Sequence, residues 1–200
     1  MLLLGERLRN APVMSLRVGI KVARTVAPVI DPRTLTIAAY EVDGPSLDSK
    51  PSFLLVADIR ELSDLGMIID DSDELVGEGD VIKLQETREF NFNLIGMKVI
   101  DARGRRLGRV EDYTVDTDSF TIQQLSVRAG LIGSLSSTGH MVHRSQIIEI
   151  NDQHIVVKST EKKLTSLETS GAVHRTYSNP FRRPMSEPQP ESSHANQTHL

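Results

Sequence analysis

The chain has 200 residues and a formal net charge of −4, an acidic balance that argues against a protein whose whole surface binds nucleic acid. It has no cysteine, which excludes disulfides and thiolate metal sites. Hydrophobic residues make up 38% and aromatic residues only 4%, so Val, Ile and Leu have to form most of the core, as is typical of short β-strands.

Apolar stretches are short throughout the chain. Residues 1–5 are too few for a signal peptide and have no basic region before them. No run approaches the roughly 18 apolar residues that a membrane span needs. We therefore expect a soluble cytoplasmic protein without a membrane span.

An internal repeat organises the sequence. Residues 30–42 align without a gap to residues 115–127, and in both copies a β-branched residue and an Asp precede a polar turn and a strand. Within each strand the apolar residues switch from one alternating set to the other, which a regular strand with one buried face cannot do. A β-bulge near 38–39 and another near 123–124 restore the pattern and bend the strands, as small barrels require.

The repeat extends in both directions and predicts five or six short strands in each half. Within the first half we expect a short helix at residues 58–65 and one more strand at residues 81–84. The further matching segments are 3–8 with 94–99, 18–22 with 107–110, and 53–59 with 140–147.

The composition changes after about residue 159. Residues 161–200 contain four prolines among many Ser, Thr, Asn and Gln residues, and such a segment cannot bury enough apolar surface to offset its ordering entropy. The prediction is an all-β fold with two consecutive small β-barrels, residues 1–88 and residues 89–160. A disordered tail, residues 161–200, follows them.

Residues 93–112 resemble the opening of PRC-barrel domains. In that family a strand with an apolar-Gly pattern leads to a glycine turn with basic residues. The motif Leu-Gly-basic-Val-x-Asp follows, and it matches residues 107–112 here. Residues 115–127 and 145–147 also fit, so that the resemblance covers residues 94–158. The first half resembles the family more loosely, and its assignment depends mainly on the internal repeat.

The resemblance implies SH3-like barrels that serve as small adaptor modules and share no catalytic residues. PRC-barrel domains occur in a photosynthetic reaction-centre subunit, in a 16S rRNA maturation factor and in stand-alone prokaryotic proteins. We therefore expect a non-enzymatic tandem PRC-barrel adaptor that binds another cytoplasmic protein, without cofactor or metal. The alternative is an RNA-linked factor in 16S rRNA processing that contacts RNA or the ribosome. The oligomeric state stays open.

Arginines are densest at one predicted turn, and we call this group the arginine cluster. In one interpretation it contacts RNA phosphates or an acidic partner. In the other it is a solvated hairpin turn whose charge nearby carboxylates offset. The cluster consists of Arg103, Arg105, Arg106 and Arg109.

Two segments outside the predicted strands are further candidates for partner contact. Leu131, Ile132 and Leu135 lie in a Gly/Ser-rich loop, where they cap their own barrel or contact the other barrel or a partner. In the tail, aromatic residues beside Arg and Pro form a candidate docking motif. Its residues are Tyr177, Phe181, Arg182 and Arg183.

Histidine and aspartate positions favour structural roles. His140 and His143 are three positions apart, which puts them on opposite faces of a strand and prevents them from sharing a metal ion. Asp31 and Asp116 hold equivalent positions in the repeat, and each begins a turn, where Asp typically caps its own backbone. We therefore expect no metal site and no catalytic carboxylate pair.

Overall fold

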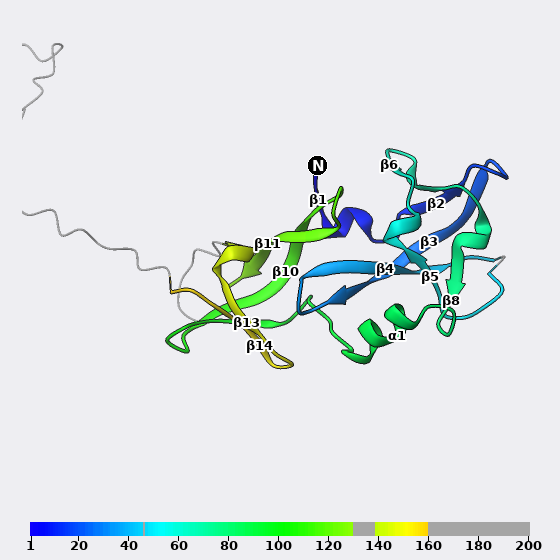
Figure 1. Ribbon diagram of the computed structural model, residues 1–200. Helices are drawn as coiled ribbons and strands as arrows, with labels where there is room; N and C mark the ends of the chain where they lie inside the picture. Colours follow the sequence, from blue (N-terminus) through cyan, green and yellow to red (C-terminus); the bar gives the residue numbers. More distant parts are fainter. Residues whose placement is uncertain (46, 130–138, 160–200) are drawn as a thin grey trace, which may run out of the picture. The chain divides into compact units, whose positions relative to one another are not determined.

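The computed structural model describes residues 1–45, 47–129 and 139–159, and these contain one hydrogen-bonded sheet of 14 strands (Figure 1). In the first half the strands are β1 (Leu2–Leu4), β2 (Pro12–Ser15), β3 (Ile20–Asp31), β4 (Thr36–Asp43), β5 (Ser52–Leu55), β6 (Glu61–Ser63), β7 (Gly66–Ile69) and β8 (Leu75–Gly77). In the second half they are β9 (Lys98–Asp101), β10 (Arg106–Asp116), β11 (Thr121–Arg128), β12 (His140–His143), β13 (Ile147–Ile150) and β14 (His154–Val157).

Short helices connect some of these strands. The 3-10 helices are η1 (Gly5–Leu8), η2 (Val56–Asp58), η3 (Ser72–Glu74) and η4 (Arg144–Gln146). The α-helix α1 (Ile82–Glu89) contacts β3 and β4, and its Leu84 packs with Ala39 and Phe53 in a small cluster of its own. No helix within the described parts of the chain is long and apolar enough to span a membrane.

Two sets of six strands have the same pairing order. The order is β6-β7-β2-β3-β4-β5 in the first half and β13-β14-β9-β10-β11-β12 in the second. In each set the only parallel pair has the same place, β7 with β2 and β14 with β9. The described strands do not close into barrels as predicted, because η2 separates β5 from β6 and η4 separates β12 from β13, and neither strand pair is hydrogen-bonded.

The two predicted bulges are confirmed. Ala39 pairs with Val29 and Ile37 with Ile30, which leaves Ala38 as the extra residue of β4. In β11, Gln123 is the extra residue in the same way. The bulge turns successive apolar side chains of each strand into the core, and the buried residues are Ile37, Tyr40 and Val42 in β4 and Ile122, Leu125 and Val127 in β11.

The halves meet at two equivalent turns. Thr36 of β4 pairs with Thr121 of β11. Ile37 N donates to Phe120 O at 2.9 Å, and Ile122 N donates to Leu35 O at 2.8 Å. These bonds are reciprocal between equivalent repeat positions, so the junction has local twofold symmetry. One hydrophobic cluster contains buried side chains of both halves, so the halves share a core.

Two predicted alignments are wrong. Residues 18–22 do not correspond to residues 107–110, because Gly108 pairs with Val99 in the way that Ala23 pairs with Val13. Gly5 does not correspond to Gly96; the structural equivalent of Gly96 is Asn10. Both have positive φ, 58° for Asn10 and 87° for Gly96. Asn10 N donates to Thr25 O and Gly96 N donates to Val110 O in the same arrangement. Asparagine tolerates the left-handed region better than most residues, so it replaces glycine at this position.

Two local predictions in the first half are also wrong. No helix spans residues 58–65, where one was expected. The short helix η2 ends at Asp58, and the strand β6 lies within this segment. The strand expected at residues 81–84 is the beginning of α1. A short, mostly apolar segment such as Val81-Ile82-Lys83-Leu84 looks the same in a strand and in the first turn of a helix. The described residues therefore form a mainly β fold with one α-helix rather than the all-β fold that was expected.

Candidate functional site

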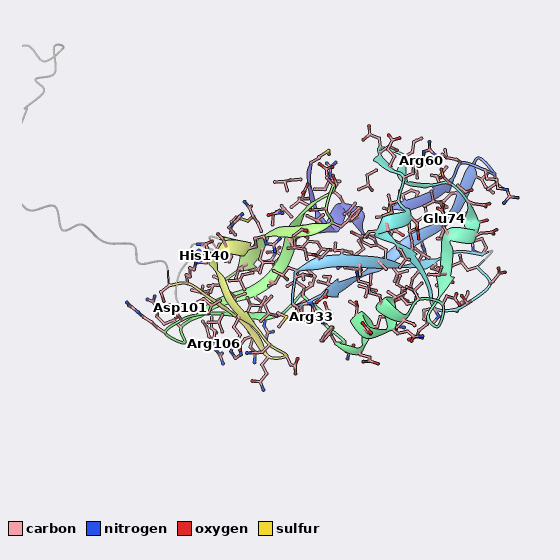
Figure 2. The ribbon with its side chains drawn as sticks, viewed as in Figure 1. Arg33, Arg60, Glu74, Asp101, Arg106 and His140 are labelled. Atoms are coloured by element: carbon pink, nitrogen blue, oxygen red, sulfur yellow. The ribbon has the colours of Figure 1, made fainter. Side chains whose placement is uncertain are left out.

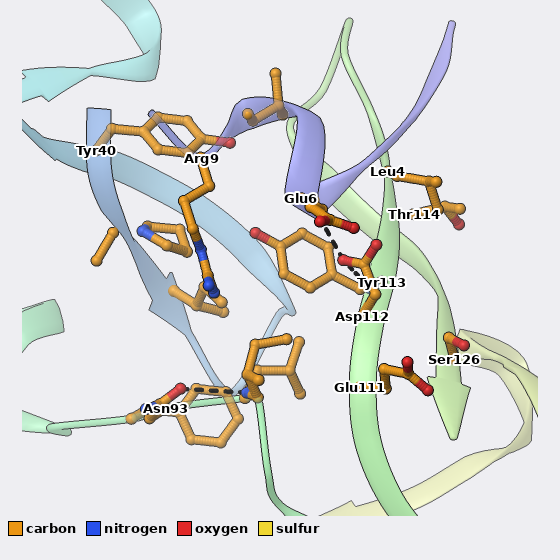
Figure 3. A pocket seen from close by; sticks show the side chains of 18 of the residues that line it. Leu4, Glu6, Arg9, Tyr40, Asn93, Glu111, Asp112, Tyr113, Thr114 and Ser126 are labelled. Atoms are coloured by element: carbon orange, nitrogen blue, oxygen red, sulfur yellow. Dashed lines mark hydrogen bonds between the residues drawn. The ribbon is translucent and has the colours of Figure 1, made fainter. Parts of the chain in front are cut away.

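A cavity of about 740 Å³ is lined mostly by residues from four segments (Figure 3). These segments are η1 with the following Arg9, part of β3, residues 92–95, and β10. Residues of both halves of the repeat therefore line it. Its floor is apolar and includes the buried side chains of Leu8, Ile30 and Leu94. We call it the central cavity.

The N-terminal strand places η1 over the central cavity. β1 pairs with the end of β10, Leu2 opposite Asp116 and Leu4 opposite Thr114. η1 then crosses β10, where Glu6 N donates to Asp112 Oδ1 at 3.2 Å. Gly5 permits this close approach, because a Cβ atom there would overlap the Tyr113 ring.

Three hydroxyl groups at the cavity wall are buried or nearly so. Tyr40 is 1% exposed, and neither its hydroxyl nor that of Thr114 has a hydrogen-bond partner among the described residues. Burial, with a further contribution from Tyr113, raises the pKa of Tyr40 far above its usual value. Burial and then the charge of Asp112 raise the pKa of Tyr113 to about 12. Both phenols therefore stay protonated at neutral pH and can donate hydrogen bonds.

Opposite charges lie at the two ends of the central cavity. The Arg9 side chain extends beside Tyr40 and has no hydrogen bond or ion pair with any described residue. Glu6, Glu111 and Asp112 lie on the other side of Tyr113 (Figure 3). Glu111 pairs with Arg128, and Asp112 accepts hydrogen bonds from two backbone N–H groups. One end thus offers donors and the other offers acceptors.

The arginine cluster lies at the hairpin between β9 and β10 (Figure 2). Asp101, whose side chain is 1% exposed, organises this turn: Arg103 N and Arg105 N donate to its Oδ1, and Arg105 Nε donates to its Oδ2 at 2.6 Å. Arg109 Nη1 donates to Gly96 O at 2.7 Å. Contact of this cluster with RNA or an acidic partner stays a prediction.

Asp101→Asn is expected to destabilise the fold more at neutral than at acid pH. Burial raises the pKa of Asp101, but hydrogen bonds from Arg105 and Arg103 outweigh this, and the pKa lies below its usual value of 3.8. A carboxylate with a lowered pKa contributes stability above its unfolded pKa and loses it as the pH falls through its folded pKa.

Thermal unfolding followed by circular dichroism at pH 7 and at pH values below about 3 measures this effect. The difference in melting temperature between wild type and Asp101→Asn should shrink as the pH falls. Asp152→Asn, at an exposed carboxylate, is the control. A difference that stays constant with pH would contradict the role of the carboxylate.

The other residues singled out in the sequence have structural roles or lie outside the described residues. His143 caps η4, with its Nδ1 accepting from Ser145 N at 3.2 Å. Asp31 and Asp116 each accept a backbone hydrogen bond within their turns, as predicted. Within residues 1–159, apart from the gaps, no group of three or more His, Asp and Glu could hold a metal ion. The remaining candidates for partner contact, and the tail predicted to be disordered, residues 161–200, lie outside the described residues. These candidates are Leu131, Ile132, Leu135, Tyr177, Phe181, Arg182 and Arg183.

Sequence analysis missed the residues that line the central cavity. Tyr40 has the pattern of an apolar strand residue, and nothing local shows that its hydroxyl lacks a partner. Arg9 and Tyr113 come from opposite halves and meet only because β1 pairs with β10. The one signal in the sequence was the scarcity of tyrosine: the chain has three, and two of them, Tyr40 and Tyr113, line this cavity.

Residues 86–164 match the family model of the PRC-barrel domain, so the resemblance seen in the second half is confirmed. No curated protein matches the sequence. Within the described residues the matched segment begins in α1 and contains β9 to β14. The chain therefore contains a PRC-barrel domain, at residues 86–164.

Proposed function

We propose that the chain is a non-enzymatic adaptor of the cytoplasm, built from two PRC-type halves, and that it binds a peptide segment of another protein in the central cavity. One observation carries this proposal: the cavity between the halves has an apolar floor, a buried hydroxyl with no partner among the described residues, and opposite charges at its ends. Binding pockets combine a mostly apolar lining with a few converging polar groups in this way.

The assignment of a PRC-type fold to the first half rests on its backbone. It has the same strand order as the second half, a bulge at the equivalent position of β4, and positive φ at the equivalent turn residues, Leu35 and Phe120. A parallel pair, a bulge and a left-handed turn residue in the same order as in the second half support this assignment.

An RNA-linked role in 16S rRNA processing is the alternative. It requires the arginine cluster to contact phosphates, and an ion pair within the chain, such as that of Arg105 with Asp101, offsets part of the positive charge that such contacts use. Arg105 and Arg109 make intramolecular bonds, while the side chain of Arg106 makes none with the described residues. This engagement favours the adaptor.

Site-specific photo-crosslinking in cells tests the adaptor. A photoreactive phenylalanine analogue replaces Met141, which lines the central cavity and is 55% exposed. The control position is Ile148, which is also 55% exposed but does not line the cavity. We expect a protein adduct from position 141 that resists nuclease and is absent from position 148.

Two results would contradict the proposal. Equal adducts from positions 141 and 148 would show that the cavity is not the binding site. A nuclease-sensitive adduct, or one that requires Arg106, would make the RNA-linked role the better explanation.

A further inference from the structure

The guanidinium of Arg9 is directed to the central cavity instead of to a neighbouring carboxylate. Several exposed arginines of the chain pair with carboxylates, for instance Arg24 with Asp43 at 3.1 Å. Glu6 and Asp112 lie at the same cavity as Arg9, yet Arg9 pairs with neither. Its N–H donors therefore remain available to a ligand.

The hydroxyl of Tyr40 is a second, independent indication of a ligand. The residue is 1% exposed, lines the cavity and has no hydrogen-bond partner for its hydroxyl among the described residues. A buried polar group without a partner is costly, and most such groups in proteins are satisfied. Figure 3 shows Tyr40 at the backbone end of the Arg9 side chain and Tyr113 beside that side chain.

These three side chains present donors. Arginine has five N–H donors and no acceptor, and a protonated phenol donates one further hydrogen bond. The matching ligand group has several acceptor atoms and a negative charge. A planar carboxylate fits best, because a guanidinium binds it through two parallel hydrogen bonds. A doubly charged phosphate fits less well, because the carboxylates at the opposite end of the cavity repel it more strongly.

We infer that Arg9, Tyr40 and Tyr113 recognise the carboxylate of an acidic side chain in an extended segment of a partner protein. This inference rests on the proposed adaptor function. The cavity of about 740 Å³ is much larger than one carboxylate needs, and its buried floor of Leu8, Ile30 and Leu94 accommodates an apolar side chain next to the acidic one. Glu6 at the far end accepts from a backbone N–H or a basic side chain of the same segment.

Selection from a phage-displayed library of random dodecapeptides on the immobilised full chain tests the inference. The wild type is expected to enrich peptides with Asp or Glu at a fixed position beside an apolar residue. Arg9→Gln should lose this acidic preference. Arg7→Gln is the matched control, because Arg7 lies in η1, two residues before Arg9, and is exposed but does not line the cavity.

A double-mutant cycle with the best enriched peptide then isolates the contact. Replacing the acidic residue of the peptide by its amide should weaken binding to the wild type about tenfold, the size of a charge-assisted hydrogen bond. The same replacement should have almost no effect on binding to Arg9→Gln, because the partner group is already absent. Calorimetric titration gives all four affinities.

Tyr40→Phe separates recognition from folding. It removes only the hydroxyl, so the melting temperature should stay the same or rise, because a buried group without a partner is lost. Peptide affinity should nevertheless fall about fivefold, the size of a neutral hydrogen bond. Unchanged affinity would overturn the role of the hydroxyl.

The outcomes distinguish this inference from the adaptor function beneath it. If peptides compete for the cavity without any acidic preference, or if Arg9→Gln selects the same acidic peptides, the carboxylate inference is wrong and the adaptor remains. If no peptide is enriched on the wild type, both the adaptor and the inference are contradicted.

Discussion

Replacing Phe120 by alanine is expected to lower the free energy of unfolding of the whole chain by about 3–5 kcal/mol, the usual cost of deleting a buried Phe ring. Phe120 is 7% exposed and lies at the junction of the halves. Its ring meets that of Tyr40 edge-on, with the centroids 6.4 Å apart. Because the core is shared, the loss should appear as a single transition rather than as unfolding of one half.

The equivalent position of the repeat offers a second test of the junction. Leu35→Ala should cost about 2–5 kcal/mol, because Leu35 is 5% exposed and belongs to the same hydrophobic cluster. Both alanine variants keep a side chain at a residue with positive φ, so backbone strain is unchanged and only the packing differs.

Urea unfolding followed by circular dichroism and by tyrosine fluorescence measures both effects. Ile148→Ala, at a position that is 55% exposed, is the control and should cost less than about 0.5 kcal/mol. Separate transitions in wild type, or a Phe120→Ala effect as small as that of the control, would show that the halves fold independently.

Gly108→Ala is expected to cost about 3 kcal/mol or more, because two unfavourable effects combine. Gly108 has φ of +149°, a conformation that L-residues rarely adopt. A Cβ atom would also overlap the carbonyl oxygen of Arg128 on the neighbouring β11 and lie 3.0 Å from Val127 Cγ1. The backbone at Gly108 and the neighbouring strand β11 are both held by the sheet, so a shift of either costs free energy.

Gly104→Ala separates conformational strain from crowding. Gly104 has φ of +79°, but no atom lies within 4 Å of the position of its Cβ. Its substitution should therefore cost only the strain of a left-handed residue, about 1–2 kcal/mol. Denaturation midpoints of the two variants give the comparison, and equal losses would exclude close packing at Gly108 as the cause.

The glycine of the Leu-Gly-basic motif thus has a structural reason. The pairing between β9 and β10 shifts in register between Arg106 and Gly108, which marks an irregularity in the strand. At this point β10 lies so close to β11 that no side chain fits. Asp112 and Tyr113, which line the central cavity, follow on the same strand.

The sequence alone determined those features that depend on neighbouring residues. In each strand the apolar residues change from one alternating set of positions to the other, at residues 38–39 and at residues 123–124. This change predicted both bulges correctly, because side chains that alternate between two faces cannot otherwise bury both sets of apolar residues. The ordered motifs of residues 93–112 were sufficient to recognise the PRC-barrel domain, since its turn glycines and strand pattern are local.

Only the tertiary structure decided the features that depend on distant residues. Residues 81–84 lie at the beginning of a helix instead of in a strand, because Leu84 packs against Ala39 and Phe53, and no local pattern contains that contact. The pairing of β1 with β10 joins residues more than a hundred positions apart, and it brings Arg9 to Tyr113. Long-range pairing depends on how the two halves bury a common core, and so the candidate site could not be read from the sequence.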